Sequence, residues 1–371
     1  MENASTTWVG LDAHKKFIQV AIQRPGDALE EWRVPYTPRD VKRLVRKSTK
    51  NADGPVRLCY EAGPLGFELQ RRIHAAAKDA DVRCAVIAPS LIPKKPGDRI
   101  KTDRKDARQL CELFRAGLLT EVHAPTEADE SVRDLCRARG AAKKDLNSAR
   151  HRLSKLLLRR GRIYTNGRPW TQKHRVWLNA LCFEAPVDTV VFNDHLLAID
   201  QIEARVRSLD GAIAELAQLE PYAERVGWLR CFHGIDTLSA LTLLAEIHDF
   251  RRFDHPRQLM SYLGLTPSEH SSAGESRKGA ITKAGNSRVR RLLVEAAWHY
   301  RHRPRVGKAL AKRRQGQSPR VIAVADKAHK RLYGRYQRLT VGSRKPPNKA
   351  VVAVARELVG FLWAVLREPV A

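Results

Sequence analysis

Thr7-Trp-Val-Gly-Leu-Asp12 and, after Ala13-His-Lys-Lys16, Phe17-Ile-Gln-Val-Ala-Ile22 are the two runs from which the fold can be worked out. The region 6–24 that contains them alternates apolar with polar positions and is rich in Val and Ile, as half-buried strands are. Only four residues separate them. The sequence therefore predicts a β-hairpin at the start of the chain.

Strands and helices alternate after this hairpin. Val56-Arg-Leu-Cys-Tyr60 predicts a third strand, which ends at the breaker Ala62-Gly-Pro64. A helix over about 66–80 then leads to a strand at 83–88, and another helix begins near Thr102 and continues through Phe114. A hairpin followed by strand–helix alternation predicts an α/β domain with a mixed sheet.

Four acidic residues fall at the ends of these elements. Asp12 and Glu61 end predicted strands, and ligands of open α/β sheets gather beyond the carboxyl ends of strands. Asp103 and Asp106 are three apart, so a helix places them on one face. Convergent carboxylates suit Mg²⁺, and two such ions can hold both the attacking and the leaving oxygen of a phosphoryl transfer. The alternative is helix capping by Thr102 or Asp103, with Asp106 simply solvated.

The chain is strongly basic. Its 371 residues include 68 Lys+Arg and 40 Asp+Glu, a net charge of +28. Such an excess indicates a polyanionic partner, most often nucleic acid. Residues 226–371 hold 28 basic and 10 acidic residues, so we expect the phosphate-binding surface mainly in the last third. An anionic membrane surface is the competing partner, but no lipidation motif is present.

The length allows two or three domains, and we place them at 1–126, 127–225 and 226–371. The middle part predicts long helices with heptad spacing, in 135–156 and again in 199–216. Two readings stay open for these helices. They either pack on each other within one chain or form an arm for dimerisation.

The last part contains two candidate nucleic-acid elements. Leu229-Arg-Cys-Phe-His-Gly-Ile-Asp-Thr-Leu-Ser-Ala240 resembles a helix-hairpin-helix, which offers backbone N–H groups to a phosphate. Ser268-Glu-His-Ser-Ser-Ala-Gly-Glu-Ser276 predicts a turn-rich loop whose serines include a possible nucleophile. We expect the basic residues that follow it to contact phosphates: Arg277, Lys278, Lys283, Arg288, Arg290 and Arg291.

The remaining features indicate a cytoplasmic protein. The six cysteines form no Cys-x-x-Cys pair and predict buried thiols in a reducing compartment. The N-terminus has no apolar run typical of a signal peptide. The apolar stretch from Val351 to Leu366 is interrupted by Arg356 and Glu357 and is too short to span a bilayer.

Taken together, the motifs resemble those of the DEDD-type insertion-sequence transposases, the insertion-sequence-110 family. The resemblance rests on Gly-Leu-Asp, Tyr-Glu-Ala-Gly, Lys-Thr-Asp-Arg-Lys-Asp-Ala, Gly-Ile-Asp-Thr-Leu-Ser-Ala, Gly-Leu-Thr-Pro and Gly-Ala-Ile-Thr-Lys-Ala-Gly-Asn, in that order along nearly the whole chain. It implies an α/β RNase H-like (RuvC-like) N-terminal domain, a helical coiled-coil insert and a mostly α C-terminal transposase domain.

The resemblance also implies the site and the partners. The four acidic metal ligands of the family correspond to Asp12, Glu61, Asp103 and Asp106, and its catalytic serine to Ser272, with Ser271 as the second choice. Family members more often have Ser-Gly-Gly or Ser-Gly where this chain has Ser-Ala-Gly. The implied partners are donor and target DNA, a structured bridge RNA and further copies of the chain as a dimer or tetramer, at the nucleoid of a bacterial or archaeal cell.

Three functions of different class remain open at this point. The first is a DNA recombinase that uses metal and serine. The second is a RuvC-like nuclease that uses water as the nucleophile, with 226–371 acting as a DNA clamp. The third is a basic nucleic-acid-binding protein without activity.

Overall fold

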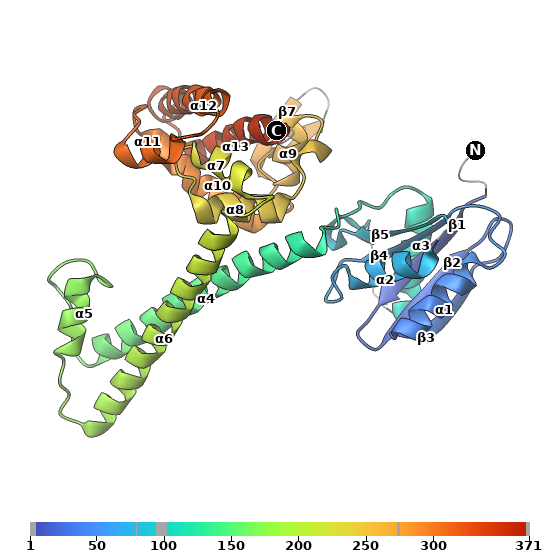
Figure 1. Cartoon of the computed structure of the whole chain (residues 1–371), viewed down its shortest axis with the longest axis horizontal. Coiled ribbons are helices and arrows are strands. Elements are labelled where there is room, and N and C mark those ends of the chain that lie inside the picture. Colours follow the sequence, from blue (N-terminus) through green and yellow to red (C-terminus); the bar gives the residue numbers. More distant parts are fainter. Residues whose placement is uncertain (1–4, 79, 94–101, 273–274, 369–371) are drawn as a thin grey trace. The chain divides into compact units, whose positions relative to one another are not determined.

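The computed structural model describes residues 5–78, 80–93, 102–272 and 275–368 (Figure 1). Residues 270–272 and 275–278 are described by their backbone alone. The chain divides into two compact units, Met1–Pro125 and Thr126–Ala371. Within the described ranges, no helix is both long enough and apolar enough to cross a membrane.

A five-stranded mixed sheet forms the centre of the first unit, with its strands in the order β3-β2-β1-β4-β5. The strands are β1 (Thr7–Ala13), β2 (Phe17–Gln23), β3 (Glu30–Pro35), β4 (Val56–Glu61) and β5 (Val82–Ile87). β1, β2 and β3 are antiparallel neighbours, whereas β4 runs parallel to β1 and β5 runs parallel to β4. The predicted hairpin and mixed sheet are confirmed, and the arrangement fits an RNase H-like domain.

Three helices flank this sheet: α1 (Pro38–Thr49), α2 (Glu68–Ala77) and α3 (Asp103–Arg115). The last two were predicted, but β3 and α1 were not. β3 is an edge strand in which only Val34 is buried. α1 buries just three aliphatic side chains, Val41, Leu44 and Val45, between many basic residues. Neither segment therefore carries a strong apolar pattern.

The backbone of α3 lies directly against β1 at Gly10. A Cβ atom at this position would come within 2.2 Å of Ala107 O and 2.4 Å of Cys111 N. The Cys111 thiol donates a hydrogen bond back to Trp8 O at 3.3 Å. Because a side chain at position 10 would push the helix away, Gly10 allows the first turn of α3 to lie over the end of β1.

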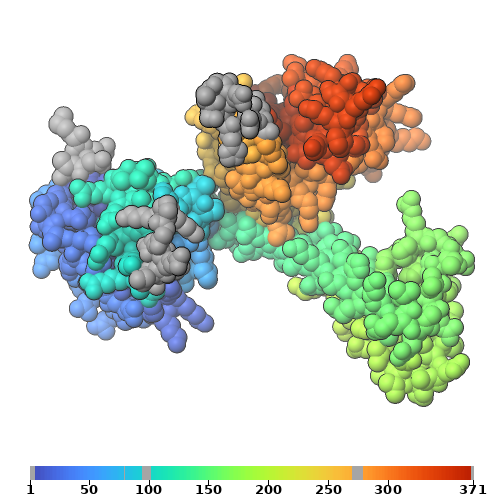
Figure 2. Space-filling model, turned by 180° about the vertical axis from the view of Figure 1, so that it is seen from behind, coloured from blue at the N-terminus to red at the C-terminus, as the bar shows by residue number. Residues whose placement is uncertain are grey.

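Two long antiparallel helices begin the second unit: α4 (Glu127–Arg159) and α6 (Pro186–Leu216). Leu146 and Leu153 of α4 share a buried cluster with Ile199 of α6, and α5 (Gln172–Asn179) packs into the same cluster. Arg139–Asp210 and Arg150–Glu203 ion pairs link the two helices, in the order that antiparallel packing requires. In space-filling view the end of this helical pair near α5, coloured light green, projects away from the orange and red helices (Figure 2), whereas the start of α4 and the end of α6 pack against α8. The two helices thus pack on each other within one chain.

The rest of the second unit is mostly helical and is built around α13 (Pro347–Leu366). Nine residues of α13 are buried, including Leu358 and Leu362, and the helix packs against α9, α10 and α12. The apolar C-terminal stretch is therefore the central helix of a core. The surrounding elements are α7 (Ala223–Arg230), α8 (Thr237–Ile247), α9 (Pro256–Tyr262), α10 (Ser287–Ala297), α11 (Lys308–Arg314) and α12 (Pro319–Gln337).

The segment 268–276 was predicted to be a loop, and the structure corrects this. Residues 268–272 and 275–276 belong to two paired antiparallel strands, β6 (Pro267–Ser272) and β7 (Glu275–Ile281), called the β6–β7 hairpin below. The two strands pair through their backbones, and their sequence has no regular alternation of apolar residues that would mark a strand. The polar, serine-rich composition of this segment therefore predicted a loop where the backbone forms strands.

Two glycines lie at the base of this hairpin, where the backbone around Gly264 packs against the backbone around Gly285. Gly264 and Gly285 both have positive φ, +62° and +66°. A Cβ on Gly264 would lie 2.2 Å from Ala284 O, and one on Gly285 would lie 1.9 Å from Tyr262 O. The motifs Gly-Leu-Thr-Pro and Lys-Ala-Gly-Asn thus pack backbone to backbone, which explains why both contain glycine.

A buried carboxylate connects three helices of the second unit. Glu246 of α8, whose side chain is 1% exposed, accepts hydrogen bonds from both Nε and Nη2 of Arg137 on α4 at 2.9 and 2.8 Å. Asn286, which caps α10, donates to it at 2.7 Å, and Arg288 lies 3.4 Å away. Burial by itself would raise the pKa of Glu246, but these hydrogen bonds and charges lower the pKa below its usual value.

We expect Gly10→Ala to destabilise the first unit by about 1–3 kcal/mol, because the added methyl group overpacks the contact with α3. Urea unfolding of the full chain, followed by circular dichroism, measures the change. Gly63→Ala is the matched control, since a Cβ there would meet only Glu61 O at 3.8 Å. Equal stability of the two variants would show that α3 does not depend on Gly10.

Glu246→Gln should lower the free energy of unfolding by about 1.5–3 kcal/mol near neutral pH, because charge-assisted hydrogen bonds to Arg137 are lost. The lowered pKa of Glu246 means that this stability is present above its unfolded pKa and is lost as pH falls through the folded pKa. Unfolding curves from pH 7 to about pH 3 should therefore converge for the two proteins. Glu295→Gln, at a 62% exposed position on α10, serves as the neutral control. A constant difference at all pH values would refute the ionised network.

Candidate metal centre

Asp12 and Glu61 lie at the ends of neighbouring strands, as predicted. β1 and β4 are parallel, and Leu11 pairs with Tyr60, so that Asp12 and Glu61 are the next residues along the two strands. The Asp12 side chain is 19% exposed, whereas Glu61 is an exposed residue. The sheet register thus brings two carboxylate-bearing residues to one edge of the first unit.

The first turn of α3 supplies the other two acidic residues. Thr102 caps this helix, and its side-chain oxygen accepts a hydrogen bond from Lys105 N at 3.3 Å. Thr102 therefore takes the capping role that was weighed for Asp103. The carboxylate of Asp103 instead approaches the β1–β2 turn and β3, with Oδ1 3.5 Å from His14 Nε2 and Oδ2 3.4 Å from Arg33 Nη2.

The electrostatic environment of Asp12 reflects this arrangement. Burial raises the pKa of Asp12, the nearby His14 lowers it, and the negative charges of Asp103 and Asp106 raise it. The net effect is a raised pKa. Mutual repulsion of this kind is relieved when a cation binds between the carboxylates.

His14 belongs to this cluster, and the sequence did not single it out. Its Nε2 lies 3.1 Å from Asp12 Oδ2, two residues earlier on the same hairpin. The pattern Asp-x-His at a hairpin turn was visible in the sequence. A histidine in such a turn is usually a solvated residue, however, and only the position of α3 shows that Asp103 lies beside it.

One donor atom each from Asp12, His14 and Asp103 lies within 4.8 Å of the others. Adjacent ligands of an octahedral ion with metal–ligand bonds of 2.0–2.1 Å are about 3 Å apart, so a hard divalent cation could hold these three atoms after they move slightly closer together. Among the described residues, this group of three donors contains neither Glu61 nor Asp106. The structure therefore brings together Asp12 and Asp103 with His14, and it does not bring Glu61 or Asp106 into this group.

An open hollow of about 620 Å³ lies beside Asp103. Arg104 and Arg108 of α3 both bind Glu31 of β3, whose side chain is 5% exposed. These ion pairs hold α3 against the antiparallel edge of the sheet. The hollow offers space next to the carboxylates for a phosphate group, and its lining residues are Gln19, Glu31, Arg33, Thr102, Asp103 and Arg104.

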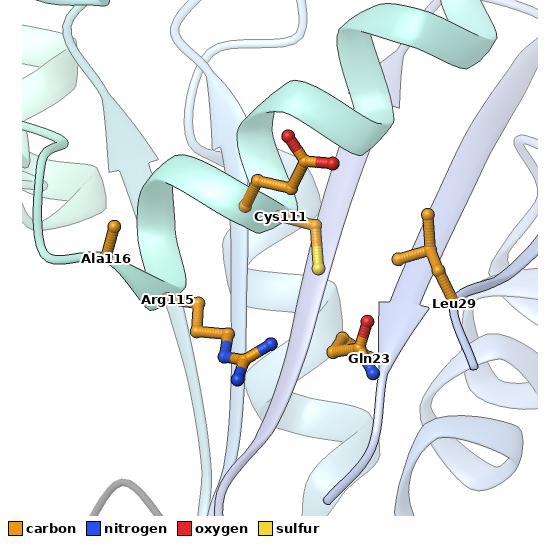
Figure 3. A pocket seen from close by; sticks show the side chains of 6 residues that line it. Gln23, Leu29, Cys111, Arg115 and Ala116 are labelled. Atoms are coloured by element: carbon orange, nitrogen blue, oxygen red, sulfur yellow. The ribbon is translucent and has the colours of Figure 1, made fainter. Parts of the chain in front are cut away.

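A second hollow, of about 340 Å³, lies near the C-terminal end of α3 (Figure 3). Arg115 of α3 extends toward Gln23 of β2 across it, and Leu29 lies on the far side. Burial raises the pKa of the Cys111 thiol in its wall to about 11. A protonated thiol is a poor nucleophile, and this hollow lies at the other end of α3 from Asp103. It does not form part of the metal centre.

The basic residues predicted to bind phosphates have different surroundings in the second unit. Arg288 pairs with the buried Glu246, and Arg290 donates hydrogen bonds to Leu263 O and Ala284 O at 2.9 and 2.8 Å. Both guanidinium groups thus support the local fold. Arg291 is exposed and lies 3.5 Å from Glu295, and Lys283 is exposed. The side chains of Arg277 and Lys278 lie outside the described residues.

Ser272 is the last residue of β6, and Ser271 precedes it in the strand. Cα pairing places Ser272 opposite Glu275 and Ser271 opposite Ser276. The side chains of both serines lie outside the described residues.

The helix-hairpin-helix-like segment forms α7, a turn and α8. Gly234 in the turn has φ +75°, and α8 begins after its cap, Asp236. The Asp236 carboxylate accepts a hydrogen bond from Thr237 N at 2.8 Å and pairs with Arg230 and Arg313. A carboxylate of the chain itself thus occupies the helix N-terminus that was expected to face a phosphate.

Comparison with known proteins supports the same family throughout the chain. A transposase family model of the DEDD IS110 type matches residues 9–160, and the model of the transposase IS116/IS110/IS902 family matches residues 228–311. A putative transposase, y4qE, of Sinorhizobium fredii is 40% identical over 97% of this chain and 88% of its own length. The transposase for insertion sequence element IS1533 of Leptospira borgpetersenii is 34% identical over 91% of this chain and 98% of its own.

The matches cover the sheet with its acidic residues and also the helical core with the β6–β7 hairpin. The fold, the acidic cluster and two relatives aligned over nearly their full length all indicate the same family. The chain belongs to the insertion-sequence transposases of the IS110/IS116 family and is a DNA transposase, a phosphoryl-transfer enzyme.

Proposed function

We propose that this transposase cuts and rejoins donor and target DNA at a site where Asp12, Glu61, Asp103 and Asp106 hold Mg²⁺ and Ser272 attacks the phosphodiester. The observation that carries the proposal is the convergence of Asp12 and Asp103 beside an open hollow. Bound divalent cations would polarise the scissile phosphate and stabilise the leaving oxygen.

The chain's own residues have distinct tasks in this proposal. Asp12 and Asp103 are the inner carboxylates. Glu61 would reach the metal from the neighbouring strand β4, and Asp106 from a position three residues further along α3. Arg33 and Arg104 line the hollow beside Asp103 and would hold a nonbridging phosphate oxygen. In the first step Ser272 would form a phosphodiester with one DNA end and release the hydroxyl of the other. In the second step the hydroxyl of another DNA end would attack this ester, release the serine and rejoin the strands.

The carboxylates and Ser272 belong to different compact units. We propose that the active form is a homo-oligomer, in which the carboxylates of one copy act with the serine of another. Exposed aliphatic side chains on the α4–α6 pair support association: Leu158, Val187, Val190 and Leu197 are 53–71% exposed. Burying such a surface against another copy would be favourable, as in a coiled-coil arm.

We also propose that a structured bridge RNA selects the donor and target sequences. The support is the family to which the chain belongs together with its net charge of +28, which suits more than one polyanion at once. In this proposal base pairing supplies the sequence specificity, and the protein binds the backbones.

Asp106→Asn should abolish Mg²⁺-dependent strand cleavage and leave DNA affinity nearly unchanged, because it removes a metal ligand and not a phosphate contact. Cleavage of a labelled DNA and binding by filter retention are measured in parallel. Asp40→Asn is the matched control, because Asp40 also lies in the first turn of a helix, α1, next to its Thr cap. Full cleavage by Asp106→Asn would contradict the four-ligand site.

Ser272→Ala should eliminate the covalent protein–DNA complex that the wild-type chain forms when rejoining is blocked by a nicked substrate. Denaturing electrophoresis of labelled DNA detects this complex. Ser268→Ala, in the same strand, is the control and should keep the complex. If Ser271→Ala loses the complex and Ser272→Ala keeps it, the nucleophile is Ser271. Cleavage by the wild type without any covalent complex would instead indicate a RuvC-like nuclease that uses water.

A further inference from the structure

His14 is placed by the hairpin itself. It opens the tight turn between β1 and β2, in which His14 N donates a hydrogen bond to Phe17 O at 2.9 Å. Asp12 lies two residues earlier, at the end of β1. The short turn holds the backbone of His14 beside the end of β1, within reach of Asp12.

Neighbouring side chains fix the orientation of the ring. The rings of His14 and Phe17 are 4.9 Å apart at an angle of 46°, and the guanidinium of Arg33 covers the Phe17 ring at 4.1 Å. Arg33 also lies 3.4 Å from Asp103 Oδ2. With this oxygen engaged by Arg33, the other carboxylate oxygen, Oδ1, is the one that lies near His14.

We propose that His14 is a ligand of the metal centre and gives it a mixed nitrogen and oxygen donor set that prefers Mn²⁺ to Mg²⁺. This inference rests on the proposed function, whose four ligands are all carboxylates. His14 Nε2 lies 3.1 Å from Asp12 Oδ2 and 3.5 Å from Asp103 Oδ1. Adjacent ligands of a six-coordinate ion are about 3 Å apart, so one ion can reach all three atoms with small side-chain shifts.

The preference follows from the chemistry of the donors. Mg²⁺ strongly favours oxygen ligands and keeps several of its waters, so an imidazole adds little to its binding. First-row transition ions bind imidazole more readily, and Mn²⁺ also accepts carboxylates in octahedral geometry. His14 should therefore strengthen the binding of Mn²⁺ much more than that of Mg²⁺.

The test uses the full chain and Mn²⁺ as the probe. Electron paramagnetic resonance of free Mn²⁺ gives the affinity, and electron spin echo envelope modulation detects nitrogen coordinated to the bound ion. The wild type should show ¹⁴N modulation. His14→Gln should lose it and bind Mn²⁺ about tenfold or more weakly, while its affinity for Mg²⁺, measured by competition, changes little. His151→Gln, an exposed histidine on α4, should behave as the wild type.

Absence of ¹⁴N modulation in the wild type, or its persistence in His14→Gln, would overturn the assignment. Asp12→Asn distinguishes this failure from failure of the proposed function. If Asp12→Asn loses Mn²⁺ while His14→Gln keeps both the affinity and the nitrogen signal, only the role of His14 is wrong. If Asp12→Asn binds Mn²⁺ as the wild type does, the proposed metal centre itself is wrong. Retained Mg²⁺ affinity in His14→Gln shows that this variant is folded.

Discussion

The contact between Gly10 of β1 and the backbone of α3 is the constraint on which the proposed metal centre depends. Asp12 belongs to strand β1 and Asp103 to helix α3, and the two elements are far apart in the sequence. They meet because Ala107 O and Cys111 N lie where a side chain at position 10 would be. The ion pairs of Arg104 and Arg108 with Glu31 hold the same helix against β3. The close packing at Gly10 thus brings the carboxylates of Asp12 and Asp103 together, and their repulsion contributes to the raised pKa of Asp12.

In the second unit several arginines bind carboxylate and carbonyl groups of the fold itself. Glu246 is buried and ionised, and it binds Arg137, Asn286 and Arg288 from two other helices. Arg290 stabilises the carbonyl groups at the base of the β6–β7 hairpin. Part of the large positive charge therefore maintains the fold and is not free to bind DNA. Arg291 and Lys283 face solvent and remain available for the proposed contacts with polyanions.

Much of the first unit could be predicted because its signals are local. The β1–β2 hairpin, the strand ending at Glu61 and the helix starting at Asp103 all follow from apolar alternation and breakers. β3 and α1 were missed because an edge strand and a largely exposed helix need few apolar residues. The β6–β7 hairpin was predicted to be a loop because its serines and glycine suggest turns, whereas its strands rest on backbone pairing.

The site was predictable only in part, for a related reason. The acidic residues could be found from their positions at element ends, since that placement depends on local sequence. The roles of His14, Glu246 and Arg290 depend on contacts between segments far apart in the chain. His14 requires Asp103, 89 positions later, and Glu246 requires Arg137, 109 positions earlier. Spacing along the sequence does not contain that information.

The most direct test of the account is a crystal structure of the full chain grown with Mn²⁺, with diffraction data collected at the manganese absorption edge. Anomalous scattering locates the ion independently of any assumption about its ligands. We predict an anomalous manganese peak within about 2–2.5 Å of carboxylate oxygens from both Asp12 and Asp103. A manganese ion bound elsewhere, or bound without Asp12, would contradict it.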